Sequence, residues 1–244
     1  MYMQLWYTCI IKIILNGDHN RMKKIILLLA AILMITASLS AQEIFFSTKE
    51  GQKLTYASMD DKGKVNSYSQ QTISKVTGSG KNISIAYIIQ MLDNNQKPIS
   101  STPEATYTIN IVDNVMELDI KSLAPPGTEG VAVITGDKIR IPAKLKPGDK
   151  LEDVKMTITI SMGIKLVTDI LINQRECLAI EEVTVPAGKF KCNKLSETNS
   201  VTTMKNTTVT KNITWYAPGI GMIKLETYDS KGKLLASNVL QSIK

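Results

Sequence analysis

Apolar and polar side chains alternate along residues 154–166. The apolar positions are Val154, Met156, Ile158, Ile160, Met162, Ile164 and Leu166. A period of two residues is typical of a β-strand with one buried face. At about 3.3 Å per residue the segment would make one strand of roughly 40 Å, unless it bends near Gly163. A strand of this length needs partners along its length, so the sequence predicts that the rest of the chain supplies a sheet.

From Gln42 onward the chain repeats this arrangement in other segments. Apolar stretches are separated by turns rich in Gly, Pro, Asn and Asp, and no segment has the pattern of a helix of normal length. The other predicted strands are 52–59, 64–76, 83–91, 105–112, 115–120, 131–134, 138–141, 178–185, 189–192, 198–214, 222–228 and 234–239. We therefore expect an all-β fold, an antiparallel meander coiled into a barrel or half-barrel, because coiling hides the apolar face and protects strand edges. A sandwich of two sheets is the alternative.

The first 41 residues have the features of a leader. Met22 and two lysines precede the apolar run 25–35, and small residues lead to Ala41, which is the order of a secretory signal peptide. The apolar run is shorter than the roughly 20 residues of a membrane span. We expect 1–21 to be an over-extended gene start, 22–41 a signal peptide, and 42–244 one β-domain that does not span the membrane after cleavage.

Two further features refine this domain. The residue after the predicted cut is Gln42 and not cysteine, so no lipid anchor is expected. The segment 123–130, with Pro125, Pro126 and Gly127, is the candidate subdomain boundary or flap within the domain.

The residue types of the mature segment argue against several functions. Loss of residues 1–41 leaves a net charge of +4 without a basic cluster, so no nucleic-acid partner is expected. The sole histidine, His19, belongs to the leader, so the segment 42–244 has no residue for His-dependent catalysis or for a His-containing zinc site.

The sequence contains neither a phosphate loop nor a CxxC pair, so we expect no cofactor and no metal site. Adjacent carboxylates at 60–61, 152–153 and 181–182 are the remaining catalytic option, but neighbours on a strand point to opposite faces. We expect no enzyme.

The mature segment keeps two cysteines, Cys177 and Cys192, which are a candidate disulfide in an exported protein. A hairpin that pairs Val185 with Lys189 would set Cys192 opposite Glu182 and leave Cys177 on the other face. Such pairing holds the Cα atoms beyond the roughly 7 Å that a disulfide allows. A bulge or a longer loop would restore the bond, and two buried free thiols are the alternative.

The apolar face of residues 154–166 is larger than a minimal core requires, so it also offers a binding surface. The candidate ligand-facing residues are Met156, Ile158, Ile160, Met162 and Trp215. The leading hypothesis is a non-enzymatic protein that binds a lipid or another apolar ligand in the concave face of the barrel. The alternative is a structural or assembly module that presents a sheet edge, or the ribbon 198–214, to another envelope protein.

Two motifs in the second half of the chain resemble a known family. They are Val183-Thr184-Val185-Pro186-Ala187-Gly188-Lys189-Phe190-Lys191-Cys192 and Trp215-Tyr216-Ala217-Pro218-Gly219-Ile220-Gly221-Met222-Ile223-Lys224. Together they resemble the TapB-like exported family of Gram-negative bacteria, a group of unknown function, over residues 51–240. The resemblance implies an exported β-protein of the periplasm or cell envelope and carries over no catalytic residue. In outline the family is similar to periplasmic lipoprotein carriers, an analogy of fold only.

Overall fold

The computed structural model describes residues 44–101, 104–118, 120 and 130–244. All of them belong to one unit, residues 42–244. The predicted gene extension 1–21, the predicted signal peptide 22–41 and most of the predicted flap 123–130 lie outside the described residues. In the described part of the chain, no helix is long and apolar enough to cross a membrane.

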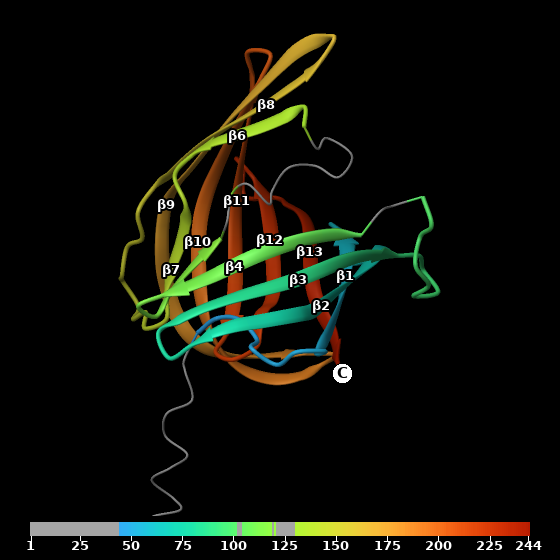
Figure 1. The fold of residues 1–244 in the computed structure, drawn as a ribbon, viewed down its shortest axis with the longest axis vertical. Coiled ribbons are helices and arrows are strands. Elements are labelled where there is room, and N and C mark those ends of the chain that lie inside the picture. The colour runs from blue at the N-terminus through green and yellow to red at the C-terminus, as the bar shows by residue number, and fades with distance from the viewer. Residues whose placement is uncertain (1–43, 102–103, 119, 121–129) are drawn as a thin grey trace, which may run out of the picture. The chain divides into compact units, whose positions relative to one another are not determined.

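The described residues form one antiparallel sheet of 13 strands (Figure 1). The strands are β1 (Lys53–Asp60), β2 (Val65–Ser79), β3 (Asn82–Leu92), β4 (Ala105–Val112), β5 (Val115–Leu118), β6 (Ala132–Gly136), β7 (Ile139–Pro142), β8 (Val154–Met162), β9 (Ile164–Val185), β10 (Gly188–Thr203), β11 (Asn206–Ala217), β12 (Gly221–Asp229) and β13 (Leu234–Ile243). Their order in the sheet is β6-β8-β9-β10-β11-β12-β13-β1-β2-β3-β4-β5-β7. Most neighbours in the sheet are neighbours in the sequence, which confirms the predicted all-β antiparallel meander.

The first and the last strand of the chain are neighbours in the interior of the sheet, so neither of them is an edge strand. β13 pairs with β1, for example through Leu240 and Tyr56. The edge strands are β6 and β7, which do not pair with each other although only residues 137–138 separate them. Gly136 ends β6 with a φ of +131°, and a Cβ there would lie 2.2 Å from the carbonyl oxygen of Lys155. Only glycine allows this close approach of the backbones.

The alternating segment 154–166 is a hairpin, so the prediction of one long strand was wrong. Gly163 has a φ of +76° and reverses the chain between β8 and β9. Met162 pairs with Ile164 directly across this turn. Paired residues share one face of a sheet, so the apolar positions continue on the same face after the reversal. The alternation is therefore the same for a straight strand and for this hairpin.

One face of the sheet can be followed across the long strands by the pairing of residues. Met156 pairs with Ile170, Ile170 with Val201, and Val201 with Thr208. Tyr216 lies an even number of residues from Thr208 on β11 and so shares its face. We call this face the inner face and the opposite one the outer face.

The inner face closes over a core between the two halves of the sheet. Ile85 of β3 and Ile111 of β4 belong to one buried cluster with Cys177 of β9 and Leu195 of β10, and Tyr216 packs against it. In Figure 1, β2, β3 and β4 run across the long strands β9–β12. The sheet therefore folds over on itself, as expected for a half-barrel.

A second core forms around the far end of the β9–β10 hairpin. Val185 and Cys192 of this hairpin cluster with Ile213 and Trp215 of β11 and with Leu240 of β13. β9 also contacts β12 and β13, which are not its neighbours in the sheet. The hairpin end therefore bends across these strands, and its apolar side chains are buried against them.

Candidate functional site

The predicted apolar surface lies on the inner face of β6, β8 and β9. Met156 is buried and packs with Ile172, so it belongs to a small core. Ile158 and Ile160 are only half-buried, although they continue the same stripe along β8. The side chain of Met162 is outside the described residues, so its predicted role stays a prediction.

Each of the half-buried isoleucines has a large aliphatic partner on one neighbouring strand. Ile158 pairs with Ile134 of β6, and Ile160 pairs with Leu166 of β9. Ile170 lies next to them on β9 and packs against the Met156 core. We call these five half-buried residues the aliphatic patch: Ile134, Ile158, Ile160, Leu166 and Ile170. The patch presents incompletely buried apolar surface, which an apolar ligand could cover.

The inner face becomes polar where it passes from β9 to β10–β13. Ile172 pairs with Asn199 of β10, and Glu197 pairs with Asn212 of β11. Thr214 shares the face of Asn212, and its partner Leu225 of β12 pairs with Asn238 of β13. The Oδ1 atoms of Asn199, Asn212 and Asn238, which we call the amide row, are buried and accept no hydrogen bond from the described residues. Buried amide oxygens are normally paired with a donor. The inner face thus joins an apolar half to a half that can accept hydrogen bonds.

An arginine is buried beside the polar half. Arg175 is 4% exposed, and its guanidinium donates hydrogen bonds of 2.9 Å and 3.2 Å to the carbonyl oxygens of Glu152 and Arg140. Its Nε lies 3.5 Å from the Glu197 carboxylate. Burial raises the pKa of the nearby Tyr216, and Glu197 raises it further, so this phenol stays protonated. These contacts tie β9 to the segments before β8 and hold Glu197 at the inner face.

Trp215 lies on the outer face and does not join the other predicted ligand-facing residues. It is separated from Thr208 by an odd number of positions on β11, whereas Met156 shares the face of Thr208. Its ring is 6% exposed. Trp215 is therefore part of the second core.

Charged side chains surround the Trp215 ring. Its Nε1 donates a 2.7 Å hydrogen bond to Oε1 of Glu181, and this bond holds the pKa of Glu181 below its usual value. The ammonium groups of Lys194 and Lys224 lie 5.1 Å and 5.0 Å from the ring centre. Lys224 also pairs with Glu226 at 2.6 Å. The arrangement combines cation–π and charge-assisted contacts on an aromatic anchor.

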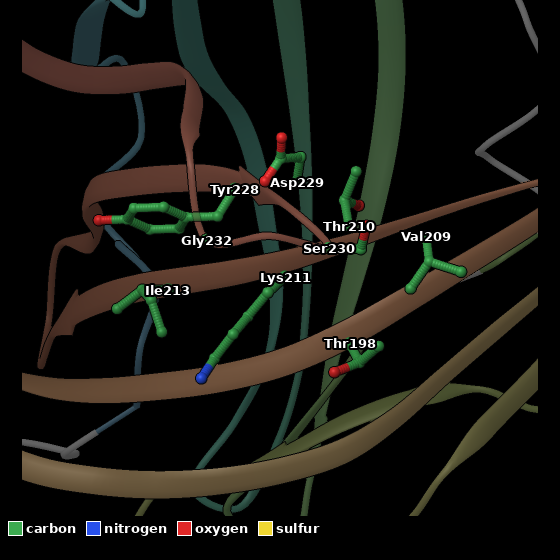
Figure 2. A pocket seen from close by; sticks show the side chains of 9 residues that line it. All are labelled: Thr198, Val209, Thr210, Lys211, Ile213, Tyr228, Asp229, Ser230 and Gly232. Atoms are coloured by element: carbon green, nitrogen blue, oxygen red, sulfur yellow. The ribbon is translucent and has the colours of Figure 1, made fainter.

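A pocket opens next to this cluster on the outer face (Figure 2). It has a volume of about 480 Å³. Thr198 of β10, Lys211 of β11 and Tyr228 of β12 pair with one another across the strands and line it. Val209 and Ile213 of β11 add apolar surface, as Figure 2 shows. The pocket thus sits on the predicted ribbon 198–214.

A second hollow of about 560 Å³ lies beside β6, β8, β9 and β10. Lys155, Thr157, Asp169 and Ser200 are among its lining residues. The Thr157 hydroxyl donates a 2.8 Å hydrogen bond to Asp169. Its lining is more polar than the aliphatic patch, and the Thr157 hydroxyl in it is already bound to a carboxylate.

Cys177 and Cys192 are free and buried, so the candidate disulfide is not formed in this structure. Val185 pairs with Gly188, one residue earlier than expected, which sets Cys192 opposite Glu181. The two thiols belong to different cores, and burial raises the pKa of Cys192 to about 11. The bulge between Lys194 and Leu195 does not bring them together.

The adjacent carboxylates Glu181 and Glu182 are engaged in structural contacts. Glu181 is bound by Trp215 and by Lys194 at 3.3 Å, and Glu182 pairs with Lys189 at 2.7 Å. Within residues 44–101, 104–118, 120 and 130–244, no group of three or more His, Cys, Asp and Glu side chains could hold a metal ion.

Sequence reasoning missed the amide row and the buried Arg175. The ribbon 198–214 is rich in Thr and Asn, which favours an exposed strand, and its even-numbered β11 positions face the inner side of the sheet. The available signal was that Asn or Thr stands at every even position of 206–214, but the face that these positions occupy depends on pairing with β9 and β10. The burial of Arg175 also depends on contacts between segments that are distant in the sequence.

Comparisons with known proteins agree with this fold. An exported-protein candidate with a YmcC-like fold from Bacteroides fragilis has a crystal structure that matches with a TM-score of 0.67 at 23% identity, covering 82% of this chain and 99% of that one. A lipoprotein candidate from Parabacteroides distasonis matches with a TM-score of 0.68 at 21% identity, covering 82% and 98%. A search of curated protein sequences finds no match. The DUF3108-like family model matches residues 49–240, and the chain therefore belongs to the DUF3108-like family.

Proposed function

We propose that this protein is an exported, non-enzymatic binding protein that holds an apolar ligand, such as a lipid, on the inner face of its sheet. The observation that carries the proposal is the aliphatic patch, whose side chains are only half-buried although they lie on the same face of the sheet as the main core. Covering such side chains with an acyl chain stabilises a complex by about 1 kcal/mol for each residue. Glu197 and the amide row then offer hydrogen-bond acceptors to a polar head group.

Export and the envelope are part of the proposal. The leader pattern of residues 22–41 supports it. The two structural neighbours, whose names describe an exported-protein candidate and a lipoprotein candidate, support it as well. The TapB-like resemblance of the 183–192 and 215–224 motifs points to the same compartment.

The absence of an enzymatic role is inferred from residue chemistry. The segment after residue 41 has no histidine. Glu181 and Glu182, the adjacent carboxylates on a strand, are bound by Trp215 and Lys189 and are not directed into one cleft. A binding function needs none of the missing groups.

Binding of a fluorescent fatty acid to residues 42–244 tests the proposal. We expect saturable binding that the double variant Ile158→Asn/Ile160→Asn weakens about tenfold, since each change puts a polar amide against the ligand chain. The matched control is Val133→Asn/Val167→Asn. Both valines flank Thr159 on the opposite face of the same strands, and they are exposed. Equal loss in both double variants, or no binding by the unsubstituted protein, would overturn the proposal.

A second function, an assembly module for another envelope protein, is favoured by the pocket of Figure 2 on the ribbon 198–214. Val209 lines it and is 40% exposed, whereas Val201 is 37% exposed on the inner face of the same hairpin. A photo-crosslinking side chain at position 209 should give one discrete adduct in the periplasm. The same side chain at 201 should not. Equal labelling from both positions would argue against this function.

A further inference from the structure

Two neighbouring hairpins project from one end of the sheet. β11 pairs with β12 only as far as Thr210, so residues 206–209 of β11 extend past the β12–β13 turn. The β8–β9 hairpin extends alongside, with its turn at Gly163. Figure 1 shows both hairpins reaching beyond β12 and β13. Their tips therefore lack the cover that the rest of the sheet provides.

Each tip carries a strongly exposed apolar side chain. Ile164 is 70% exposed and Met204 is 67% exposed, the highest values among the large apolar side chains of the described residues. The pair Thr168–Thr203, whose hydroxyl oxygens lie 2.9 Å apart, joins the two hairpins just below the tips. Met204 lies one residue beyond this pair and Ile164 lies four residues beyond it, so adjacent hairpins carry two exposed apolar side chains at the same end of the sheet.

A lysine follows each apolar residue at the tips. Lys165 follows Ile164 and Lys205 follows Met204, and both lysines are exposed. Residues 159–167 and 201–208 contain no Asp or Glu. An apolar side chain beside a lysine is the combination that inserts at the boundary of an anionic bilayer, with the ammonium group at the phosphates.

We propose that the tips at Ile164 and Met204 form a docking surface for a membrane that contains anionic phospholipids. The charge of the tips selects this partner over a neutral bilayer, and both tips project from the same end of the sheet. Docking there would also set the open end of the aliphatic patch, at Ile160 and Leu166, toward the bilayer. The docking surface does not depend on whether the patch holds a ligand.

Co-sedimentation of residues 42–244 with vesicles tests this surface. We expect the protein to pellet with vesicles of phosphatidylglycerol and phosphatidylcholine and to stay in solution with phosphatidylcholine alone. Ile164→Ser/Met204→Ser and, separately, Lys165→Glu/Lys205→Glu should each lower the partition coefficient at least about tenfold. Because all four side chains are exposed, these variants should keep the circular dichroism spectrum of the parent protein.

The matched control is Leu178→Ser/Leu235→Ser, which removes two exposed leucines away from the tips. It should bind vesicles as the parent protein does. Sedimentation of the tip variants at the parental level would overturn the proposal, and so would a failure of the parent protein to bind anionic vesicles. If the parent protein is a dimer and the tip variants are monomers, the tips bind a second copy of the chain and the proposal is overturned. Fatty-acid binding by the tip variants should be unchanged, which separates this test from that of the aliphatic patch.

Discussion

The indole of Trp215 on β11 donates a 2.7 Å hydrogen bond to Glu181 on β9, across the intervening strand β10. Lys194 of β10 completes the contact, since its ammonium group lies 3.3 Å from Glu181 and 5.1 Å from the centre of the Trp215 ring. Three strands are thereby joined on the outer face by side chains as well as by the backbone. The only tryptophan of residues 42–244 therefore has a structural role in this fold.

Trp215→Phe should reduce the free energy of unfolding by about 1 to 2 kcal/mol, because the hydrogen bond to a charged acceptor is lost while most of the ring remains. Glu181→Gln should cost less, since its amide oxygen still accepts the bond. Urea unfolding followed by circular dichroism measures both changes. Glu182→Gln is the control, because the Glu182–Lys189 pair is exposed and contributes little. A Trp215→Phe variant as stable as the parent would contradict this role.

Glu117 should make stability depend on pH at the β5–β7 edge. It is buried and accepts hydrogen bonds of 2.6 Å from Lys138 and 2.8 Å from Arg140, which hold its pKa below the usual value. A lowered folded-state pKa adds stability above the ordinary glutamate pKa of about 4.3, and this stability is lost as the pH falls through the folded-state pKa. We expect Glu117→Gln to cost about 1 to 3 kcal/mol near neutral pH.

The cost of Glu117→Gln should shrink as the pH is lowered below about 4, since the parent protein then loses the same charge. Unfolding in urea at a series of pH values gives the comparison. Glu152→Gln is the matched control, because Glu152 is mostly exposed and lies 3.9 Å from Arg140. A cost that does not change with pH would show that the Glu117 charge is not its source.

The two glycines around β6 and β8 should differ in their tolerance of alanine. A Cβ on Gly163 would meet nothing within 4 Å, so Gly163→Ala carries only the strain of a positive φ, about 1 kcal/mol. A Cβ on Gly136 would collide with the backbone of Lys155, so the β6–β8 pairing must shift. Gly136→Ala should therefore destabilise the protein by at least about 2 kcal/mol more. Thermal unfolding that ranks the two variants in the opposite order would contradict the close approach.

Cys177 and Cys192 should be unreactive thiols in the folded protein. Burial raises the pKa of both, in the case of Cys192 to about 11, so little thiolate is present near neutral pH. An alkylating reagent should modify both only after denaturation, without prior reduction. A purified protein lighter by two hydrogen atoms, with no alkylation until a reductant is added, would show that a disulfide forms.

Local signals were enough to predict the class of fold and most of its strands. Both kinds of signal act within a few residues. The turn 60–63, with glycine at a positive φ, connects β1 to β2, and the alternating stretch 105–112 is β4. The reversal at Gly163 was missed because a tight hairpin preserves the alternation of 154–166. Likewise, the pairing of β13 with β1 and the separation of β6 from β7 depend on contacts between distant segments, which a local pattern does not contain.

The candidate site was predicted only in part for the same reason. Ile158 and Ile160 share a face because they alternate on one strand, and the structure has both half-buried there. Whether Trp215 shares that face depends on the register across β9, β10 and β11, and the register places it on the opposite face. The amide row has the composition of a solvent-exposed ribbon, and only the folding of the sheet brings it to the inner face.

Native mass spectrometry of the mature protein, purified gently from the periplasm of a Gram-negative host, tests the proposed lipid binding most directly. The account predicts a stoichiometric adduct of lipid size that is lost on denaturation and can be recovered by organic extraction. The occupancy of the adduct should be strongly reduced in Ile158→Asn/Ile160→Asn and unchanged in Val133→Asn/Val167→Asn. A mass equal to that of the bare chain in the unsubstituted protein would contradict the account.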